Sequence, residues 1–209
     1  LYKTMATAHK SHVKHSFPLL FDRLSLDEEG RDSLSQLLAE KSMIGRMRDR
    51  GMDDDEKLEL AEKKAAMKER LNLQIEELLG AETDIFQDYE AKKQQYQQIS
   101  GLKGKMEVSG DFDIAAQDNL AALMLDSRNL HKDLYKDDWG TLRESKEKAD
   151  DFLLVTSERY KQMAADADFL NGDQQEVFGG FLRGVYKRYE RAAEHYEKSR
   201  NKKRKKEQQ

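Results

Sequence analysis

The chain has 209 residues and a formal net charge of −4, and 37% of its residues are charged. It contains no cysteine, which excludes disulfide frameworks, zinc ribbons and thiol nucleophiles. No apolar run approaches the ~18 residues that a membrane-spanning helix requires.

A single proline, Pro18, indicates the fold class. From Asp53 to Gln209 only glycines interrupt the helical patterns, and apolar residues form narrow stripes at helical spacing. Such chains form rods and bundles of helices. We therefore predict an all-α fold, an elongated antiparallel helical bundle or coiled coil with one long central helix.

Residues 1–52 are predicted to form an N-terminal helical segment that is partly mobile. The first 21 residues contain neither acid nor arginine, whereas organellar targeting segments favour arginine, so a plain helix is the preferred interpretation. His9, His12 and His15 recur at steps of three, and two of them could share a metal. Because no acid stands nearby in sequence to complete a site, we predict a solvated polar face and no metal.

A short helix carrying Leu34, Leu38 and Ile44 is expected next, with methionines near its far end. Met43 and Met47 have two interpretations. Clustered methionines can form an adaptable binding surface, or they can fill gaps in a core. Both methionines are kept as candidate partner-binding residues.

The main helix is predicted to begin at the acidic run Asp53–Glu56. This run suits a helix cap, because the alternating acids and central glycine of an EF-hand are missing. Apolar residues continue at steps of three and four as far as Ile99, which predicts one continuous helix with Gly80 as its weak point. Four glutamines are expected on its exposed side: Gln94, Gln95, Gln97 and Gln98.

The remainder of the main body, which spans residues 53–197, is predicted to be an elongated helical bundle. Glycines from Gly101 to Gly110 are expected to reverse the chain, and a polar break follows at residues 137–141. We expect Asp173 and Glu176 to form the capping box of the last helix.

The last helix carries an apolar seam and a candidate interaction surface beside it. The expected seam consists of Phe178, Phe181, Leu182, Val185 and Tyr189. Tyr186, Lys187 and Arg188 lie beside it in sequence, and tyrosine next to arginine is typical of interaction hot spots. Gly179, Gly180 and Gly184 indicate either tight packing inside the bundle, which is preferred, or a flexible joint.

Residues 198–209 are predicted to form a basic, disordered tail. Its candidate anion-binding residues are Lys202, Lys203, Arg204, Lys205 and Lys206. Such a tail could contact nucleic-acid phosphates or anionic lipid, or it could simply remain solvated. Because it contains no aromatic residue, any nucleic-acid binding is expected to be non-specific.

The sequence contains no recognisable catalytic motif. His131 and His195 lack the glutamate three residues upstream that di-iron sites require, and phosphate-binding loops, nucleophile elbows and dinucleotide fingerprints are missing. We predict a cytoplasmic, non-enzymatic protein–protein interaction module without a cofactor: a helical scaffold, adaptor or assembly subunit. Its partner is another protein or a second copy of the chain. The alternative is an electrostatic tether that binds nucleic acid or anionic membrane through the tail, and nuclear import or secretion remain open.

Overall fold

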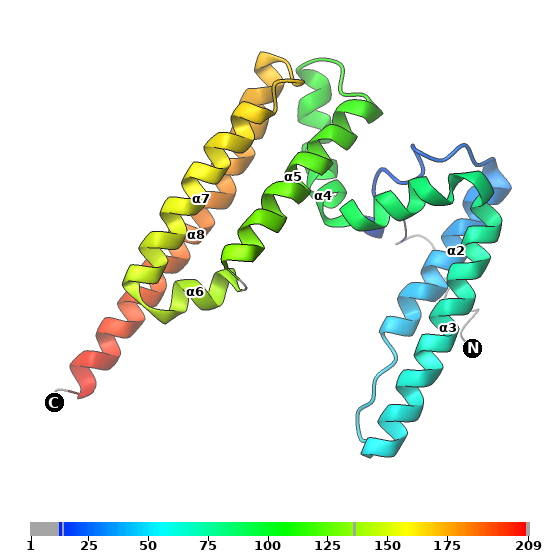
Figure 1. The fold of residues 1–209 in the computed structure, drawn as a ribbon, viewed down its shortest axis with the longest axis horizontal. Coiled ribbons are helices and arrows are strands. Elements are labelled where there is room, and N and C mark those ends of the chain that lie inside the picture. The colour runs from blue at the N-terminus through cyan, green and yellow to red at the C-terminus, as the bar shows by residue number, and fades with distance from the viewer. Residues whose placement is uncertain (1–12, 14, 136, 208–209) are drawn as a thin grey trace. The chain divides into compact units, whose positions relative to one another are not determined.

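The computed structural model describes residue 13, residues 15–135 and residues 137–207 of the chain. Over these ranges every regular element is a helix and no strand occurs, which confirms the all-α fold (Figure 1). The chain divides into two compact units, Leu1–Gln97 and Gln98–Gln209, called unit 1 and unit 2 below. The predicted boundaries after residues 52 and 197 fall inside unit 1 and unit 2, respectively.

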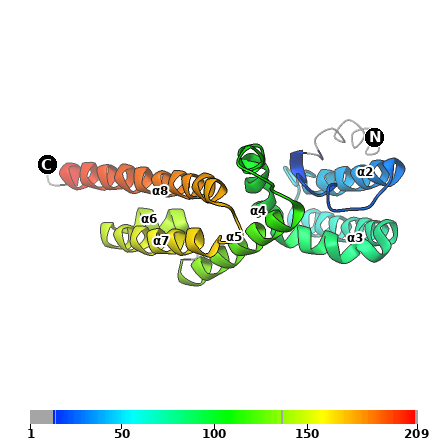
Figure 2. The ribbon, with the colours of Figure 1, turned by 90° about the horizontal axis from the view of Figure 1, so that it is seen from above.

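Unit 1 is built around an antiparallel helix pair. Helix α2 spans Glu28–Gly45 and helix α3 spans Asp54–Leu79, and the two lie side by side (Figures 1 and 2). The carboxylate of Asp27 accepts a hydrogen bond from the first turn of α2. Because α2 packs on α3, the segment before Asp53 belongs to the same unit as the helix that follows it.

The predicted cap of the main helix is confirmed. Asp53 accepts a hydrogen bond from the Glu56 amide at 2.9 Å, and the Glu56 carboxylate accepts one from the Asp53 amide at 3.0 Å. This reciprocal pair is a capping box, with both partners within four residues of sequence.

The prediction of a continuous helix from Glu56 to Ile99 is wrong, because the chain breaks at Gly80. Its φ of +52° and ψ of −115° lie outside the helical region, which favours glycine at this position. A short 3₁₀ helix, η1, covers Gly80–Glu82, and helix α4 then spans Thr83–Val108. The Thr83 hydroxyl donates to the Gly80 carbonyl at 2.8 Å and fixes the new start. Residues 56–99 are therefore divided between α3 and α4.

Stacked aromatic rings form the core of unit 1 between α4 and the segment before α2. The rings of Tyr89 and Tyr96 stack at 4.8 Å, and the Tyr89 hydroxyl donates to the Pro18 carbonyl at 2.7 Å. Lys93 lies over the ring of Phe17 at 3.2 Å. Burial raises the pKa of the Tyr89 hydroxyl above its usual value. Gln95 is also buried, contrary to its expected exposure, whereas Gln94, Gln97 and Gln98 are exposed.

Over its described residues, unit 2 contains the end of α4 and four further helices. Their bounds are α5 Ile114–Leu134, α6 Asp138–Glu144, α7 Lys146–Asp166 and α8 Gly172–Glu207. The polar break predicted at residues 137–141 is therefore largely the short helix α6, capped by Asp137. Of the predicted tail, residues 198–207 form the end of α8, and residues 208–209 lie outside the described residues.

The core of unit 2 lies where α6, α7 and α8 meet. Leu142, Ala149 and Phe152 are buried there, and residues of α8 from Tyr189 to Tyr196 pack against them. The guanidinium of Arg200 donates to the carbonyls of Leu142 and Arg143 at 3.2 and 3.0 Å, which joins α8 to α6.

The start of α8 is held by a capping box different from the predicted one. The side-chain oxygen of Asn171 accepts a hydrogen bond from the backbone N–H of Gln174 at 2.9 Å, and the side-chain oxygen of Gln174 accepts one from the backbone N–H of Asn171 at 3.2 Å. The same two side chains reach the α4–α5 turn. Asn171 donates to the Ser109 carbonyl at 3.0 Å, and Gln174 donates to the Asp111 carbonyl at 2.8 Å. These long-range bonds explain why the box uses Asn171 and Gln174 instead of Asp173 and Glu176.

Gly110 reverses the chain between α4 and α5, whereas Gly101 and Gly104 lie inside α4. The φ of Gly110 is +141°, and a Cβ placed there would collide with the side-chain nitrogen of Asn171. We therefore expect Gly110→Ala to lower the free energy of unfolding by about 1–3 kcal/mol, through backbone strain and displacement of the Asn171 cap. Urea unfolding followed by circular dichroism measures this loss. Gly104→Ala is the control, because nothing lies within 4 Å of its Cβ position, and an equal loss in both variants would contradict the explanation.

Candidate functional site

Helix α8 carries most of the predicted site residues, and its seam is buried only in part. Phe178 and Leu182 are buried, as predicted. Phe181, Val185 and Tyr189 are only half-buried. The most buried side of α8 is therefore the one that carries Phe178 and Leu182. The side that carries Phe181 and Val185 faces an opening.

That opening is a groove of about 570 Å³ between the end of α4 and α8, called the α4–α8 groove below. Its lining residues are Leu102, Lys105, Glu176, Val177, Gly180, Phe181, Gly184, Val185 and Arg188. The α8 residues form two adjacent rows at steps of four, Glu176–Gly180–Gly184–Arg188 and Val177–Phe181–Val185, so they share one face of the helix. The floor is largely apolar, while lysine, arginine and glutamate side chains supply the charges.

Two glycines keep this groove open. No atom of a neighbouring residue lies within 4 Å of a Cβ built on Gly184, and at Gly180 the nearest is a guanidinium nitrogen of Arg183 at 3.8 Å. The prediction that these glycines permit tight packing is therefore wrong. Since glycine costs a helix about 1 kcal/mol relative to alanine, the open space along α8 comes with a cost in stability.

The predicted partner-binding triplet of α8 is spread around the helix. Arg188 lines the α4–α8 groove. Lys187 is exposed, and Tyr186 is half-buried. Burial and the Glu190 carboxylate raise the pKa of Tyr186, and Lys161 of α7 opposes them. The three side chains therefore do not form one surface.

The methionine pair of unit 1 also separates. Met43 is buried in the core and Met47 is half-buried. The gap-filling interpretation therefore applies to Met43, and only Met47 presents surface to solvent. Of the predicted histidine cluster, His15 is exposed, while His9 and His12 lie outside the described residues.

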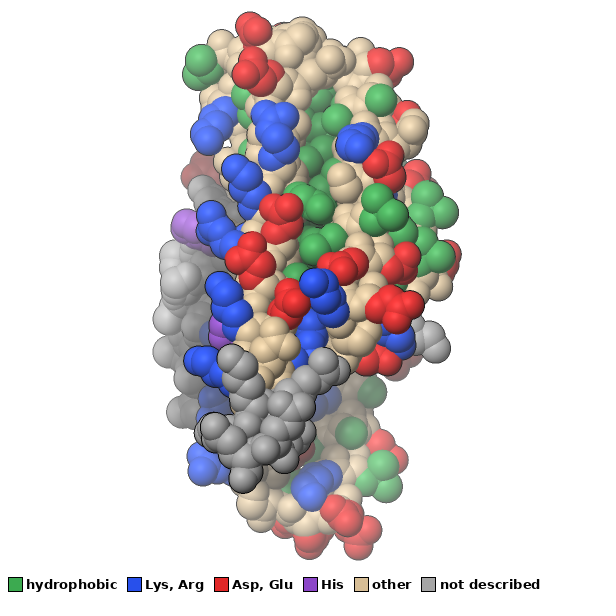
Figure 3. Space-filling model, turned by 90° about the vertical axis from the view of Figure 1, so that its left-hand side faces the viewer, with side chains coloured by type: hydrophobic (Ala, Val, Ile, Leu, Met, Phe, Trp, Pro, Cys, Tyr) green, Lys and Arg blue, Asp and Glu red, His purple; other side chains and the backbone are tan. Residues whose placement is uncertain are grey.

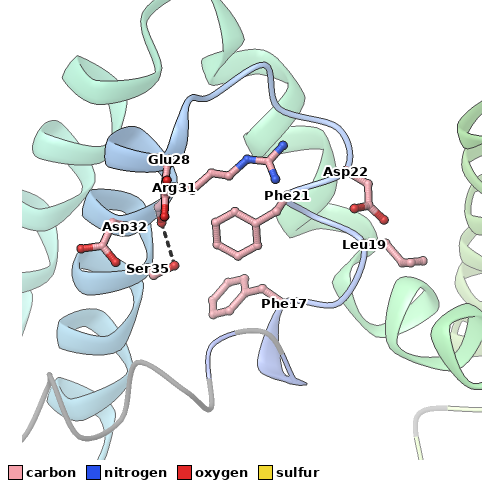
Figure 4. A pocket seen from close by; sticks show the side chains of 8 residues that line it. All are labelled: Phe17, Leu19, Phe21, Asp22, Glu28, Arg31, Asp32 and Ser35. Atoms are coloured by element: carbon pink, nitrogen blue, oxygen red, sulfur yellow. Dashed lines mark hydrogen bonds between the residues drawn. The ribbon is translucent and has the colours of Figure 1, made fainter.

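A second hollow lies in unit 1, where the segment before α2 folds over that helix (Figure 4). The rings of Phe17 and Phe21 lie one above the other inside it, and Arg31 extends above them. The Nε–H of Arg31 donates to the Leu26 carbonyl at 3.0 Å, which ties this side chain to the turn before α2. The hollow of about 420 Å³ mixes apolar rings with scattered charges and gathers no reactive set.

A buried polar cluster in unit 2 was not anticipated from the sequence. His131 of α5 is only 3% exposed. Its Nε2 lies 3.2 Å from the Thr156 hydroxyl of α7, and its Nδ1 lies 3.3 Å from the Asp138 carboxylate of α6. The other carboxylate oxygen of Asp138 accepts from the Tyr189 hydroxyl of α8 at 2.8 Å. Four helices are therefore joined through one carboxylate and one imidazole.

The electrostatics of this cluster favour an ionised Asp138. Burial raises the pKa of Asp138, but hydrogen bonds from His131 and Tyr189 and the nearby charge of Arg159 outweigh burial and lower it overall. Burial and the Asp138 carboxylate raise the pKa of Tyr189, which keeps its hydroxyl a donor. With hydrogen on Nδ1, His131 donates to the Asp138 carboxylate, and its Nε2 can accept from the Thr156 hydroxyl.

The cluster has the order hydroxyl, imidazole, carboxylate that hydrolytic triads use. Thr156 is 0% exposed, however, and His131 nearly so, so a substrate cannot reach the hydroxyl. Over the described ranges no three histidine or acidic side chains are grouped so as to hold a metal ion. The arrangement therefore suits a positioning network that fixes how the helices of unit 2 pack.

Comparison with known proteins adds no relative. No protein family, curated protein or solved structure matches this chain. Among the helices that the structure describes, none is long and apolar enough to cross a membrane.

The residues that sequence reasoning missed share one property: their partners are distant in the chain. His131 and Thr156 are 25 residues apart, and Asp138 and Tyr189 are 51 apart. One local signal was present. His131 lies four residues after Ser127, on the same helical face as buried Leu120 and Met124, which places the imidazole toward the core.

Proposed function

We propose that the protein is a non-enzymatic interaction module, and that the α4–α8 groove binds an amphipathic helix of a partner protein. The observation that supports this proposal is the apolar floor left open by Gly180 and Gly184. An amphipathic helix that inserts apolar residues at helical spacing is the usual occupant of such a groove. The inaccessible Thr156 also favours binding over catalysis.

Charge around the groove indicates the chemistry of the partner helix. Lys105 and Arg188 contribute two positive charges, and Glu176 contributes one negative charge. A partner with acidic residues beside its apolar stripe would complement Lys105 and Arg188. Opposite charges across an interface increase the association rate and fix the register of the bound helix.

A single added side chain tests this proposal. Gly184→Leu places an isobutyl group in open space within the groove and should weaken binding of the captured partner by tenfold or more. The protein partner is first isolated with the wild-type chain, and its affinity is then measured by titration calorimetry. Gly104→Leu is the matched control, since it also replaces a helical glycine with open space around its Cβ position but lies outside the groove lining.

Two results would overturn the groove proposal. One is equal affinity of the wild type and the Gly184→Leu variant for the isolated partner. The other is loss of the partner only when the chain ends at Asn201, which would favour the tether. The truncation begins after Asn201 because Arg200 is bonded to α6, so that removing it would also disturb unit 2.

A further inference from the structure

The outer face of α8 carries a regular row of cations. Arg183, Lys187, Arg191, Lys198 and Lys202 are all exposed, and we call them the basic stripe. They follow one another at steps of four, four, seven and four residues, which keeps them on one side of the helix. Exposed His195 occupies the turn between Arg191 and Lys198. In Figure 3, lysine and arginine side chains form a column along one edge of the molecule.

The basic stripe points away from the helices that α8 packs against. Phe178 and Leu182 on the opposite face are buried, and Tyr189 and Tyr196 pack on the core of α6 and α7. Packing of unit 2 therefore does not cover the stripe.

Few acids neutralise these cations. Over the described part of the chain, no ion pair or hydrogen bond joins a side chain of the basic stripe to a carboxylate. Of the three acids on this stretch of α8, Glu197 pairs with Lys146 of α7 at 3.2 Å. Glu190 lies four residues after Tyr186, whose pKa burial and this carboxylate raise, and three residues after Lys187, at the edge of the stripe. Glu194 alone is left among the exposed stripe positions.

The helical backbone joins the stripe to the basic run at the end of the chain. Because α8 extends to Glu207, Lys202–Lys206 continue the same helix. Between Arg183 and Lys206 eleven basic residues face three acidic ones, a net charge of +8 in a chain of net −4. This stretch is roughly 35 Å long at ~1.5 Å per residue. The cation surface is therefore much longer than the tail alone.

We propose that the basic stripe binds double-stranded nucleic acid through its phosphodiester backbone, without reading base sequence. Stripe residues four positions apart are separated by about 6 Å along a straight helix. A duplex presents one phosphate per ~1.7 Å of its axis, and its major groove admits an α-helix. No aromatic or apolar side chain occupies the stripe, so stacking on bases is excluded and the contacts are to phosphates.

The same features count against a lipid surface. Helices that lie on membranes bury an apolar face in the lipid, whereas the side of α8 that carries the basic stripe has no apolar residue, and Tyr189 and Tyr196 on the opposite side pack against the core of α6 and α7. A polybasic surface without a second anchoring signal binds membranes only marginally. A linear polyanion needs only the exposed row of charges.

The test measures binding of the full-length chain to two fluorescent 30-base-pair DNA duplexes of unrelated sequence, by anisotropy at several salt concentrations. The stripe variant combines Arg183→Gln, Lys187→Gln and Arg191→Gln. The control variant combines Lys132→Gln, Lys148→Gln and Lys161→Gln, which removes the same charge from exposed positions of α5 and α7. Each phosphate contact contributes about 0.9 to the slope of log affinity against log salt. The stripe variant should therefore reduce that slope by about 3 and weaken binding at least tenfold, equally for both duplexes.

Three results would overturn the inference. The control variant could weaken duplex binding as much as the stripe variant. The chain could bind phosphatidylserine vesicles but not the duplexes. Truncation after Asn201 could abolish binding while the stripe variant retains it, which would locate the site in the last residues alone. Gly184→Leu keeps every stripe cation and should retain the wild-type salt slope, so this inference and the groove proposal fail independently.

Discussion

Replacing Phe178 with alanine should lower the free energy of unfolding of unit 2 by about 3–5 kcal/mol. The ring of Phe178 is fully buried, so its removal forfeits apolar burial and leaves a cavity. Phe181→Ala should cost much less, on the order of 1–2 kcal/mol, because Phe181 is half-buried and lines the α4–α8 groove, where water already reaches it. The two rings stack at 6.3 Å on the same helix, which makes them a matched pair.

Trp139 provides the measurement. It is the only tryptophan of the chain, and its ring lies 5.3 Å from that of Tyr189 in unit 2. Its fluorescence during urea unfolding therefore reports on unit 2 and not on unit 1. A larger loss for Phe181→Ala than for Phe178→Ala would show that α8 faces its neighbours differently. The sequence pattern predicts Phe181 as one of the five residues of the buried seam.

Local signals predicted the parts of the fold that depend on neighbouring residues. The Asp53 and Glu56 capping box lies within four residues, so its geometry follows from sequence spacing. The helical segments around Leu34 and Leu120 also follow from the 3.6-residue period of burial. These elements require no knowledge of what they pack against.

The breaks and turns were less predictable because competing local solutions have similar energies. A helix tolerates one glycine at about 1 kcal/mol, so Gly101 and Gly104 stay helical whereas Gly80 does not. Asn171 and Asp173 are both good N-cap residues. The structure selects Asn171 because its amide also reaches Ser109, 62 residues away.

The candidate sites were likewise predictable only where they depend on neighbouring residues. The positive charge of the last residues was evident from composition, but its extension to Arg183 depends on α8 remaining helical through Lys198. The α4–α8 groove could not be predicted, since it requires the end of α4 to lie beside α8. The cluster around His131 could not be predicted, because the groups near its ring belong to α6, α7 and α8.

Asp138 should make the stability of unit 2 depend on pH in the acid range. Its pKa is lowered in the folded chain, where burial is outweighed by bonds from His131 and Tyr189 and by the charge of Arg159. The folded state therefore binds the proton less readily than the unfolded state does. The stabilisation is complete above the ordinary carboxyl pKa and is lost as pH falls through the lower pKa of the folded state.

Asp138→Asn removes this titration while keeping the size of the side chain. At pH 7 the variant should be less stable by about 2 kcal/mol, the typical value of hydrogen bonds to a charged group. As pH falls from 5 to 3, the wild type should lose stability more steeply, so the two urea midpoints followed through Trp139 should converge. Asp150→Asn, at an exposed position of α7, is the control and should follow the wild type throughout. If the Asp138→Asn and wild-type curves stay parallel down to pH 3, the His131–Asp138–Tyr189 network does not hold the helices together through charge. The network would then contribute to the free energy of unfolding through packing and not through charge.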